Sequence, residues 1–311
     1  MEDRILGLHH LTAIAGPAQR NYDFYRHVLG LRFIKKTVNF DDPSTYHFYF
    51  GDEVGSAGTI LTFFPWEHAA QGRPGTGQAS EIGYSVPAGS LDFWQQRLAA
   101  HGVAVGPPEA RLGEQQLSFR DPDGLPLALI VSKTPDPRTP WTTAEVSADV
   151  ALRGFHTVTL TLADPAGTAQ VLTDIFGYTL LEQDGARTRY ATDTVAGAAL
   201  IDLLAAPGTP PGTVAAGSVH HVAFRVQDDA MLLRLRERVA RSGLSITPQI
   251  DRQYFHSLYF REPGGVLFEI ATDNPGFMVD EPLAELGTHL LLPPQYEKRR
   301  TQLEAVLPKI S

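Results

Sequence analysis

The chain has no cysteine among its 311 residues. Disulfide bonds, thiolate metal sites and a cysteine nucleophile are therefore excluded, and any metal site must use histidine, carboxylate or water ligands. Long apolar runs are absent too. No stretch approaches the roughly 20 residues that span a bilayer, and the first residues lack the apolar region of a secretory signal. We therefore expect a cytoplasmic protein with no membrane segment.

Basic charge is also in short supply. Lys and Arg number 26 against 35 Asp and Glu, which gives a formal net charge of −9. A nucleic-acid partner would call for a basic patch, so we expect none. Hydrophobic residues make up 43% and charged residues 20% of the chain, as in ordinary globular proteins. At roughly 100–200 residues per domain, the length predicts two domains.

What the sequence does contain is an internal repeat. Residues 7–17, GLHHLTAIAGP, resemble residues 154–165, GFHTVTLTLADP, and a helix-like segment that ends in glycine follows each of them. Residues 80–103 resemble residues 220–244, and each continues into a strand, a Pro-Gly turn and a closing strand. The chain therefore divides into four modules with the order β-α-β-β-β: 5–66, 79–133, 152–206 and 217–273.

The four modules predict an α+β fold in which paired modules form two curved mixed β-sheets. One module alone is too small to be stable and leaves strand edges open. We expect an N-terminal domain at 1–133, a Pro- and Thr-rich linker at 134–150, a C-terminal domain at 151–273 and a tail with a helix at 274–311. Modules 1 and 4 are expected to share a sheet with a functional site, and modules 2 and 3 a sheet without one.

Two histidine doublets lie at matching places in modules 1 and 4, His9–His10 and His220–His221. Each doublet lies in the first strand of its module. Adjacent residues of a regular strand face opposite sides, so only one histidine of each pair should face the cavity. We predict the second of each pair, His10 and His221, because both keep the same offset to the apolar residues that follow. The opposite choice, His9 and His220, stays open.

Glu269 lies in the otherwise apolar closing strand of module 4, VLFEIAT. A buried carboxylate is costly unless it is paired or binds a metal, and the counterpart of Glu269 in module 2 is Ala128. A salt bridge with Arg252 or Arg261 is the alternative. Two histidines and one carboxylate on one face form the facial triad of non-haem Fe(II) oxygenases, which leaves positions open for substrate and O₂. The sequence thus predicts an Fe(II) site, with Mn(II) as the second choice.

The sequence resembles the vicinal oxygen chelate superfamily, which includes glyoxalases, bleomycin-resistance proteins and extradiol dioxygenases. Within it, the similarity is to hydroquinone-type ring-cleaving dioxygenases. The motifs that carry it cover nearly the whole chain: GLHHLTAIAG (7–16), HFYFGD (47–52), SVHHVAFRV (218–226), DRQYFHSLYFREPGGVLFEIATD (251–273) and GTHLLLPPQYEKRR (287–300). The resemblance implies an Fe(II)-dependent enzyme that cleaves a para-diol or related dihydroxy aromatic with O₂. A homo-oligomer is left open.

The resemblance maps the metal ligands onto His10, His221 and Glu269. It maps five further residues around them: His9, Thr12, His220, Arg252 and Tyr259. The arginine is expected to stabilise a phenolate or bound oxygen, and the tyrosine to donate a hydrogen bond or act as an acid or base. The two further histidines are expected to hydrogen bond around the ligands. Without the resemblance, Tyr259 would count as core packing, as its repeat partner Tyr49 does.

Two other functions stay open. A glyoxalase-I-like lyase or isomerase with Zn or Ni usually takes a carboxylate from both symmetric halves of the site. The closing strand of module 1, GTILTFFPW (58–66), contains no Asp or Glu, so the expected site has three protein ligands, which favours oxygen chemistry. The second alternative is a non-catalytic binding protein of the same fold, although such proteins typically lack the full triad.

Overall fold

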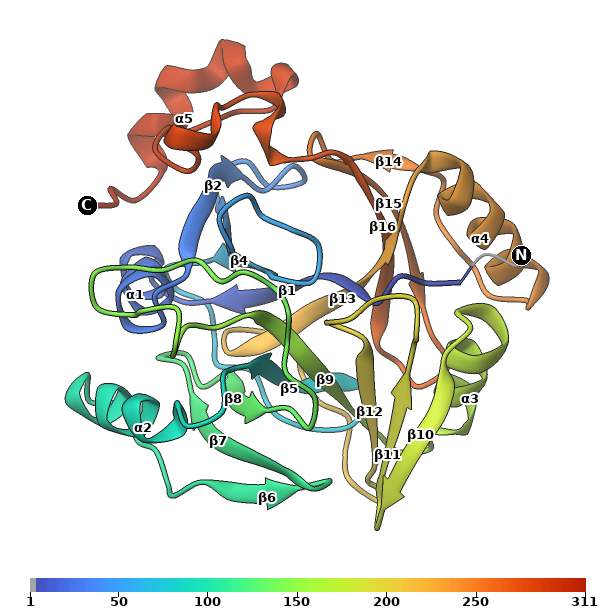
Figure 1. Ribbon diagram of the computed structural model, residues 1–311. Helices are drawn as coiled ribbons and strands as arrows, with labels where there is room; N and C mark the ends of the chain where they lie inside the picture. The colour runs from blue at the N-terminus through green and yellow to red at the C-terminus, as the bar shows by residue number, and fades with distance from the viewer. Residues whose placement is uncertain (1–3) are drawn as a thin grey trace.

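The computed structural model describes residues 4–311 and contains two eight-stranded mixed β-sheets with short helices around them (Figure 1). Each of the four modules contributes four strands, with a helix between its first and second strands. The predicted α+β fold of four β-α-β-β-β modules in two curved mixed sheets is therefore confirmed. None of the helices within residues 4–311 has the length and apolar composition needed to cross a membrane.

The elements follow the repeat closely. Module 1 comprises β1 (Leu8–Ala15), α1 (Ala18–Asp23), β2 (Arg32–Val38), β3 (Tyr46–Gly51) and β4 (Ile60–Pro65). Module 2 comprises β5 (Gln78–Ser85), α2 (Leu91–Ala100), β6 (Glu109–Arg111), β7 (Glu114–Arg120) and β8 (Pro126–Val131). Module 3 comprises β9 (Gly154–Leu162), α3 (Ala166–Gln170), β10 (Thr179–Asp184), β11 (Arg187–Ala191) and β12 (Leu200–Ala205). Module 4 comprises β13 (Ser218–Val226), α4 (Asp229–Arg241), β14 (Ile250–Asp251), β15 (Phe255–Arg261) and β16 (Leu267–Pro275).

Each sheet combines one module from each half of the chain. Sheet 1 has the strand order β14-β15-β16-β13-β1-β4-β3-β2 and therefore joins modules 4 and 1. Sheet 2 has the order β10-β11-β12-β9-β5-β8-β7-β6 and joins modules 3 and 2. In both sheets the two first strands pair antiparallel at the centre, β1 with β13 and β5 with β9. The predicted pairing of modules 1 and 4 is confirmed.

The segment predicted as a linker, 134–150, contains no helix or strand. Its neighbours are β8 and β9, which belong to different modules of sheet 2. Since each sheet draws on both halves of the chain, the halves 1–133 and 151–273 are interleaved in space. The domain boundaries themselves stay a prediction.

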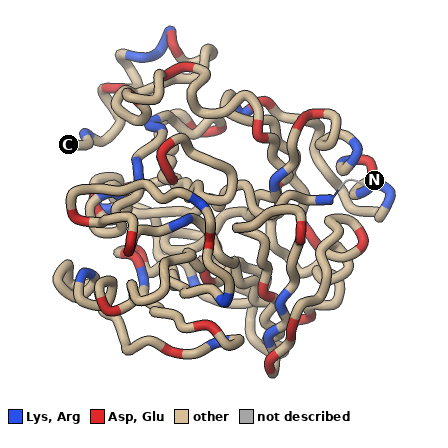
Figure 2. Tube along the Cα trace, in the orientation of Figure 1, with Lys and Arg blue, Asp and Glu red and all other residues tan. Residues whose placement is uncertain are grey.

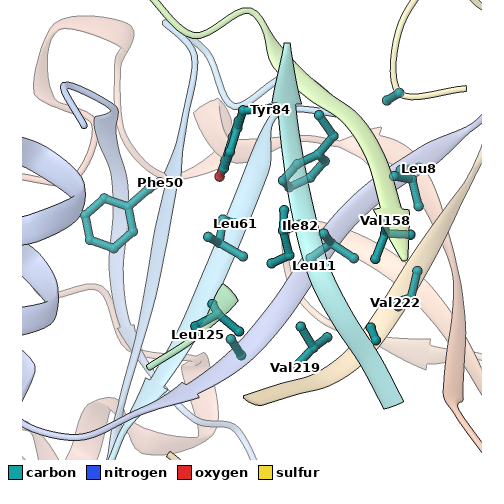
Figure 3. Close-up of a cluster of buried hydrophobic side chains, with 14 of the residues drawn as sticks. Leu8, Leu11, Phe50, Leu61, Ile82, Tyr84, Leu125, Val158, Val219 and Val222 are labelled. Atoms are coloured by element: carbon teal, nitrogen blue, oxygen red, sulfur yellow. The ribbon is translucent and has the colours of Figure 1, made fainter. Parts of the chain in front are cut away.

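The main core lies between the two sheets. Figure 3 shows Leu11 and Val222 of sheet 1 beside Ile82 and Val158 of sheet 2, and all four are fully buried. β1 is buried along its whole length because it is a central strand of sheet 1. One face of β1 packs into this core. The opposite face, which carries the second histidine of the doublet, His10, borders a second interior that contains polar side chains.

The tail after module 4 lies across the β2 edge of sheet 1 (Figure 1). It contains short 3-10 turns and a terminal helix: Phe277–Val279, Leu283–Glu285, Pro294–Arg299 and α5 (Arg300–Val306). Lys35 of β2 is fully buried, and its Nζ lies 2.7 Å from both Asp280 Oδ1 and Glu281 Oε2. The Tyr296 hydroxyl donates to the Phe40 carbonyl at 2.7 Å. The tail thereby holds the β2–β3 loop that borders the candidate site.

Candidate metal centre

Both histidine doublets lie at β-bulges in the two central strands of sheet 1. The β1–β13 pairing has an extra residue at His9 on one strand and at His220 on the other. A bulge interrupts the alternation of side chains and re-aims them. The two rings of each doublet therefore touch, with Nδ1–Nδ1 distances of 2.9 Å for His9–His10 and 2.8 Å for His220–His221. The regular alternation that we assumed for these strands does not hold here.

Three side chains converge from β1, β13 and β16, namely His10, His221 and Glu269. The two Nε2 atoms lie 3.1 Å and 2.9 Å from Glu269 Oε2 and 3.4 Å from each other. All three side chains are buried, Glu269 completely. Their ligand atoms lie within 4.8 Å of one another, and residues 4–311 contain no second such group of three His, Cys, Asp or Glu side chains.

This donor set fits a divalent first-row metal ion. Glu269 Oε2 is buried and has no hydrogen-bond partner within residues 4–311, although two imidazole nitrogens face it. Burial raises the pKa of Glu269, but His10 and His221 outweigh this effect and hold the pKa well below its ordinary value. Burial lowers the pKa of His221, which favours the neutral imidazole that a metal requires. Two imidazoles and one carboxylate are the donors of facial-triad iron sites.

His9 and His220 are arranged to hold the two candidate ligand rings. If Nε2 of a ligand histidine faces an ion, its ring proton lies on Nδ1 and is donated to the neighbouring Nδ1. Burial lowers the pKa of His9 to about 3 and that of His220 to about 4, and His10 or His221 adds to the effect. Both are therefore neutral and can accept this proton. Such bonds orient ligand imidazoles in metal sites.

Tyr259 and Arg252 lie beside the carboxylate. The Tyr259 hydroxyl donates to Glu269 Oε1 at 3.0 Å, and burial keeps its pKa above the ordinary value, so it stays a donor. Arg252 Nε donates to the Tyr259 oxygen at 3.3 Å, and its guanidinium lies 5.3 Å from the ring centre. Arg252 also pairs with Asp41 at 3.4 Å, and Arg261 donates to a backbone carbonyl. Neither arginine pairs with Glu269, so the salt-bridge alternative has no support.

The cluster opens into a cavity of ≈ 430 Å³. Five of the eight predicted site residues line it: His10, His220, His221, Arg252 and Tyr259. His9 and Thr12 are buried behind the lining and can act only through other residues, and Glu269 lies beneath its two histidines. Aromatic side chains that the sequence analysis did not assign to the site form much of the wall: Phe40, Phe64, Trp66 and Phe255.

The cavity also contains two polar side chains that the sequence analysis missed, His47 and Tyr49 of β3. His47 Nδ1 lies 2.9 Å from the Tyr49 hydroxyl, and its Nε2 lies 2.9 Å from Thr62 Oγ1. Thr62 Oγ1 in turn lies 2.8 Å from Thr12 Oγ1. A polar residue at every second position of β3 was a usable signal, because His47 and Tyr49 must then share one face.

The strand registers make modules 1 and 4 directly comparable. Tyr259 is paired with Glu269 across β15 and β16, and Tyr49 is paired with Thr62 across β3 and β4. Thr62 therefore occupies in module 1 the position that Glu269 occupies in module 4. A glyoxalase-I-type set would need its second carboxylate here. Thr62 has no carboxylate, and its hydroxyl forms a hydrogen bond with His47. The site therefore keeps three protein ligands.

Comparison with known proteins agrees with this geometry. The family model of the "Glyoxalase/Bleomycin resistance protein/Dioxygenase superfamily" matches residues 7–129 and 154–270, which comprise most of all four modules. MhqO of Bacillus subtilis (strain 168), whose name describes a candidate ring-cleaving dioxygenase, is 46% identical over 304 residues. These residues cover 98% of this chain and 96% of MhqO.

Two further relatives also extend over the whole chain. The chlorohydroquinone/hydroquinone 1,2-dioxygenase of Sphingobium indicum is 37% identical over 311 residues, 97% of this chain and 96% of that protein. A crystal structure described as a candidate dioxygenase from Bacillus subtilis has a TM-score of 0.95 and 45% identity, and it covers 100% of this chain and 99% of its own. The chain therefore belongs to the glyoxalase, bleomycin-resistance protein and dioxygenase superfamily, and within it to the relatives named as ring-cleaving dioxygenases.

Proposed function

We propose that this chain is a mononuclear Fe(II)-dependent dioxygenase that uses O₂ to cleave the ring of a hydroquinone or related dihydroxy aromatic. The observation that carries the proposal is the buried cluster of His10, His221 and Glu269, which has three protein donors and opens into a cavity with aromatic side chains in its wall. A metal with three protein ligands keeps positions for a substrate oxygen and for O₂. The name of the Sphingobium relative supports a para-diol as the substrate class.

His10, His221 and Glu269 would hold the metal, and His9 and His220 would orient the two imidazoles. Bound Fe(II) would supply the redox coupling between the diol and O₂ and would increase the acidity of a coordinated hydroxyl. The chain's own share is geometry and charge. The Nδ1–Nδ1 hydrogen bond within each doublet fixes the direction of the Nε2 lone pair of His10 or His221. The ligands therefore need little rearrangement when a metal enters.

Arg252 and Tyr259 would stabilise negative charge beside the metal. Arg252 is a fixed cation at the cavity wall, so it favours an anionic oxygen nearby. Its hydrogen bond to the Tyr259 oxygen also polarises that hydroxyl, which donates its proton to Glu269 Oε1.

The aromatic wall of Phe64, Trp66 and Phe255 would bind the ring of the substrate. Aromatic side chains bury a flat ring with little loss of their own freedom and exclude water from the reacting atoms. A cavity of ≈ 430 Å³ lies within the usual range for small-molecule sites, about 300–1,000 Å³. A glyoxalase-type four-ligand site is disfavoured by Thr62, and a non-catalytic binding protein by the complete triad.

The proposal is tested by metal analysis and oxygen uptake. Protein purified under anaerobic conditions should contain about one iron per chain. Metal-free protein should regain oxygen uptake with hydroquinones on addition of Fe(II), with Mn(II) as the comparison metal and Zn(II) as the inert control. Catechols serve as the alternative substrates. Stoichiometric iron without oxygen uptake on any hydroquinone or catechol would contradict the proposed activity.

A further inference from the structure

Tyr49 and Tyr259 face the same cavity from opposite halves of sheet 1. Tyr49 lies on the seventh strand of the sheet, β3, and Tyr259 on the second, β15. Tyr49 is paired with Thr62 and Tyr259 with Glu269, and these two partners occupy equivalent positions in modules 1 and 4. Tyr259 uses its oxygen fully, because it donates to Glu269 and accepts from Arg252. Tyr259 therefore belongs to the metal side of the cavity.

Tyr49 is bonded differently. Its oxygen has a single hydrogen-bond partner within residues 4–311, His47 Nδ1 at 2.9 Å, although the side chain is only 1% exposed. A phenolic oxygen can take part in more than one hydrogen bond. The Tyr49 oxygen therefore has unused capacity at the wall of a cavity whose other polar groups are largely engaged.

The hydrogen-bond chain behind Tyr49 gives that oxygen a defined role. A neutral imidazole has one donor and one acceptor nitrogen. The hydrogen-bond chain Tyr49–His47–Thr62–Thr12 can thus be ordered in two ways. Either the Tyr49 hydroxyl donates to His47 Nδ1, or His47 Nδ1–H donates to the Tyr49 oxygen and the tyrosine proton points toward the cavity. In both orders a hydroxyl group of a ligand finds a complementary partner at Tyr49.

The strand order separates this group from the metal ligands. β4, which carries Phe64, lies between β1 with His10 and β3 with Tyr49. The cavity wall thus includes candidate metal ligands on β1 and β13 and, beyond Phe64 on β4, the Tyr49 hydroxyl on β3. A para-diol has two hydroxyls at opposite ends of its ring, one for each of these two parts of the wall.

We propose that Tyr49, oriented by His47, binds the second hydroxyl of a ring diol whose first oxygen is bound at the metal. Tyr49 is then the residue that distinguishes a para-diol from a monophenol, and His47 is a positioning residue that acts through it. The inference rests on the proposed function, because it assumes that the first oxygen of the diol lies at the cluster of His10, His221 and Glu269.

The test is ligand binding to the Fe(II)-loaded protein without oxygen, where no turnover occurs. Calorimetry compares hydroquinone with 4-methylphenol, in which a methyl group replaces the second hydroxyl. One net hydrogen bond corresponds to about a three- to tenfold difference in Kd. We expect native protein to prefer hydroquinone by that factor and the variant Tyr49→Phe to lose the preference with little change in Kd for 4-methylphenol.

Two further variants and one control complete the design. His47→Phe should also lose the preference, and His47→Gln should restore part of it, since an amide can both donate and accept. Tyr178→Phe is the matched control: this hydroxyl is buried in the core and has no hydrogen-bond partner within residues 4–311. It should keep the native preference and show that loss of a buried tyrosine hydroxyl alone has no effect.

The outcomes separate the inference from the proposed function. If native protein binds neither ligand in a metal-dependent way, the proposed function fails and the inference with it. If native protein binds both ligands equally, the inference fails without any variant. It also fails if Tyr49→Phe keeps the preference.

Discussion

Sheets 1 and 2 have the same strand order and equivalent bulges, yet they surround a buried carboxylate with different kinds of side chain. In sheet 2 the β5–β9 register has extra residues at Ser80 and His156, just as sheet 1 has them at its two doublets. Asp202 of β12 is paired with Arg189, as Glu269 is paired with Tyr259. The two carboxylates occupy comparable places and are almost fully buried.

The partners of the two carboxylates differ. Arg189 Nε and Nη2 lie 2.7 Å and 3.0 Å from the oxygens of Asp202, and Arg187 lies 3.1 Å away. Figure 2 shows acidic and basic residues along the same strands, β10 to β12. Glu269 instead faces two imidazoles, and its Oε2 has no hydrogen-bond donor within residues 4–311. A buried carboxylate is thus a metal-site signal only where its neighbours are bases rather than fixed cations.

The largest effect should come from Glu269→Gln. Glutamine has nearly the same shape, but the site loses its one negative charge, and Fe(II) binds a neutral amide poorly. We expect iron retention and ring cleavage to fall by more than about 100-fold, beyond the effect of removing an outer-shell partner. The metal-free protein should change in stability by less than about 1 kcal/mol. Metal content and a urea titration of the metal-free variant measure the two effects.

The contrasting result would be a large loss of metal-free stability with iron retained in the folded fraction. That outcome would make Glu269 a structural residue and would remove the distinction between the two sheets.

Asp202→Asn is the matched change in sheet 2 and should act on stability alone. It leaves Arg189 and Arg187 buried with less negative charge around them. Breaking a buried ion pair costs about 3–5 kcal/mol, and we expect about 3 kcal/mol because Glu114 still pairs with Arg189 at 2.6 Å. The urea midpoint should fall while iron content per folded chain stays at the native level. Loss of iron in this variant would show that the sheets do not act independently.

The sequence allowed the repeat, the pairing of modules and the meeting of His10, His221 and Glu269 to be predicted. These features depend on matching positions in repeated segments, which can be read from one chain. The bulges could not be foreseen from side-chain alternation, because an extra residue is visible only against the partner strand. His47 and Tyr49 were missed for a related reason. Which face of β3 opens into a cavity depends on distant strands, so Tyr49 looked like core packing.

His9→Phe tests the bulge contacts with a smaller expected effect. Phenylalanine keeps a ring at the bulge but removes the acceptor for the proton on His10 Nδ1; the two Nδ1 atoms lie 2.9 Å apart. Loss of such a contact typically weakens metal affinity about 10–100-fold. Competition with a chelator measures the affinity. His156→Phe changes the equivalent bulge in sheet 2 and should leave metal affinity unaltered, so equal losses in both variants would argue for a general effect of ring substitution.

The smallest effect concerns the acid stability of sheet 2. Burial raises the pKa of Glu114, but His156 and Arg189 outweigh it and lower the pKa from 4.5 to about 2. A pKa that is lower in the folded state adds stability above the unfolded value, and this stability is lost as pH falls from 4.5 toward 2. We expect a contribution of about 1–2 kcal/mol, less than the full shift implies, because solvent screening and the shared Arg189 reduce it. Urea titrations of metal-free protein and of Glu114→Gln across this pH range provide the measurement. The difference between the two should shrink steadily as pH falls; a constant difference would mean that packing at Glu114, not its charge, stabilises sheet 2.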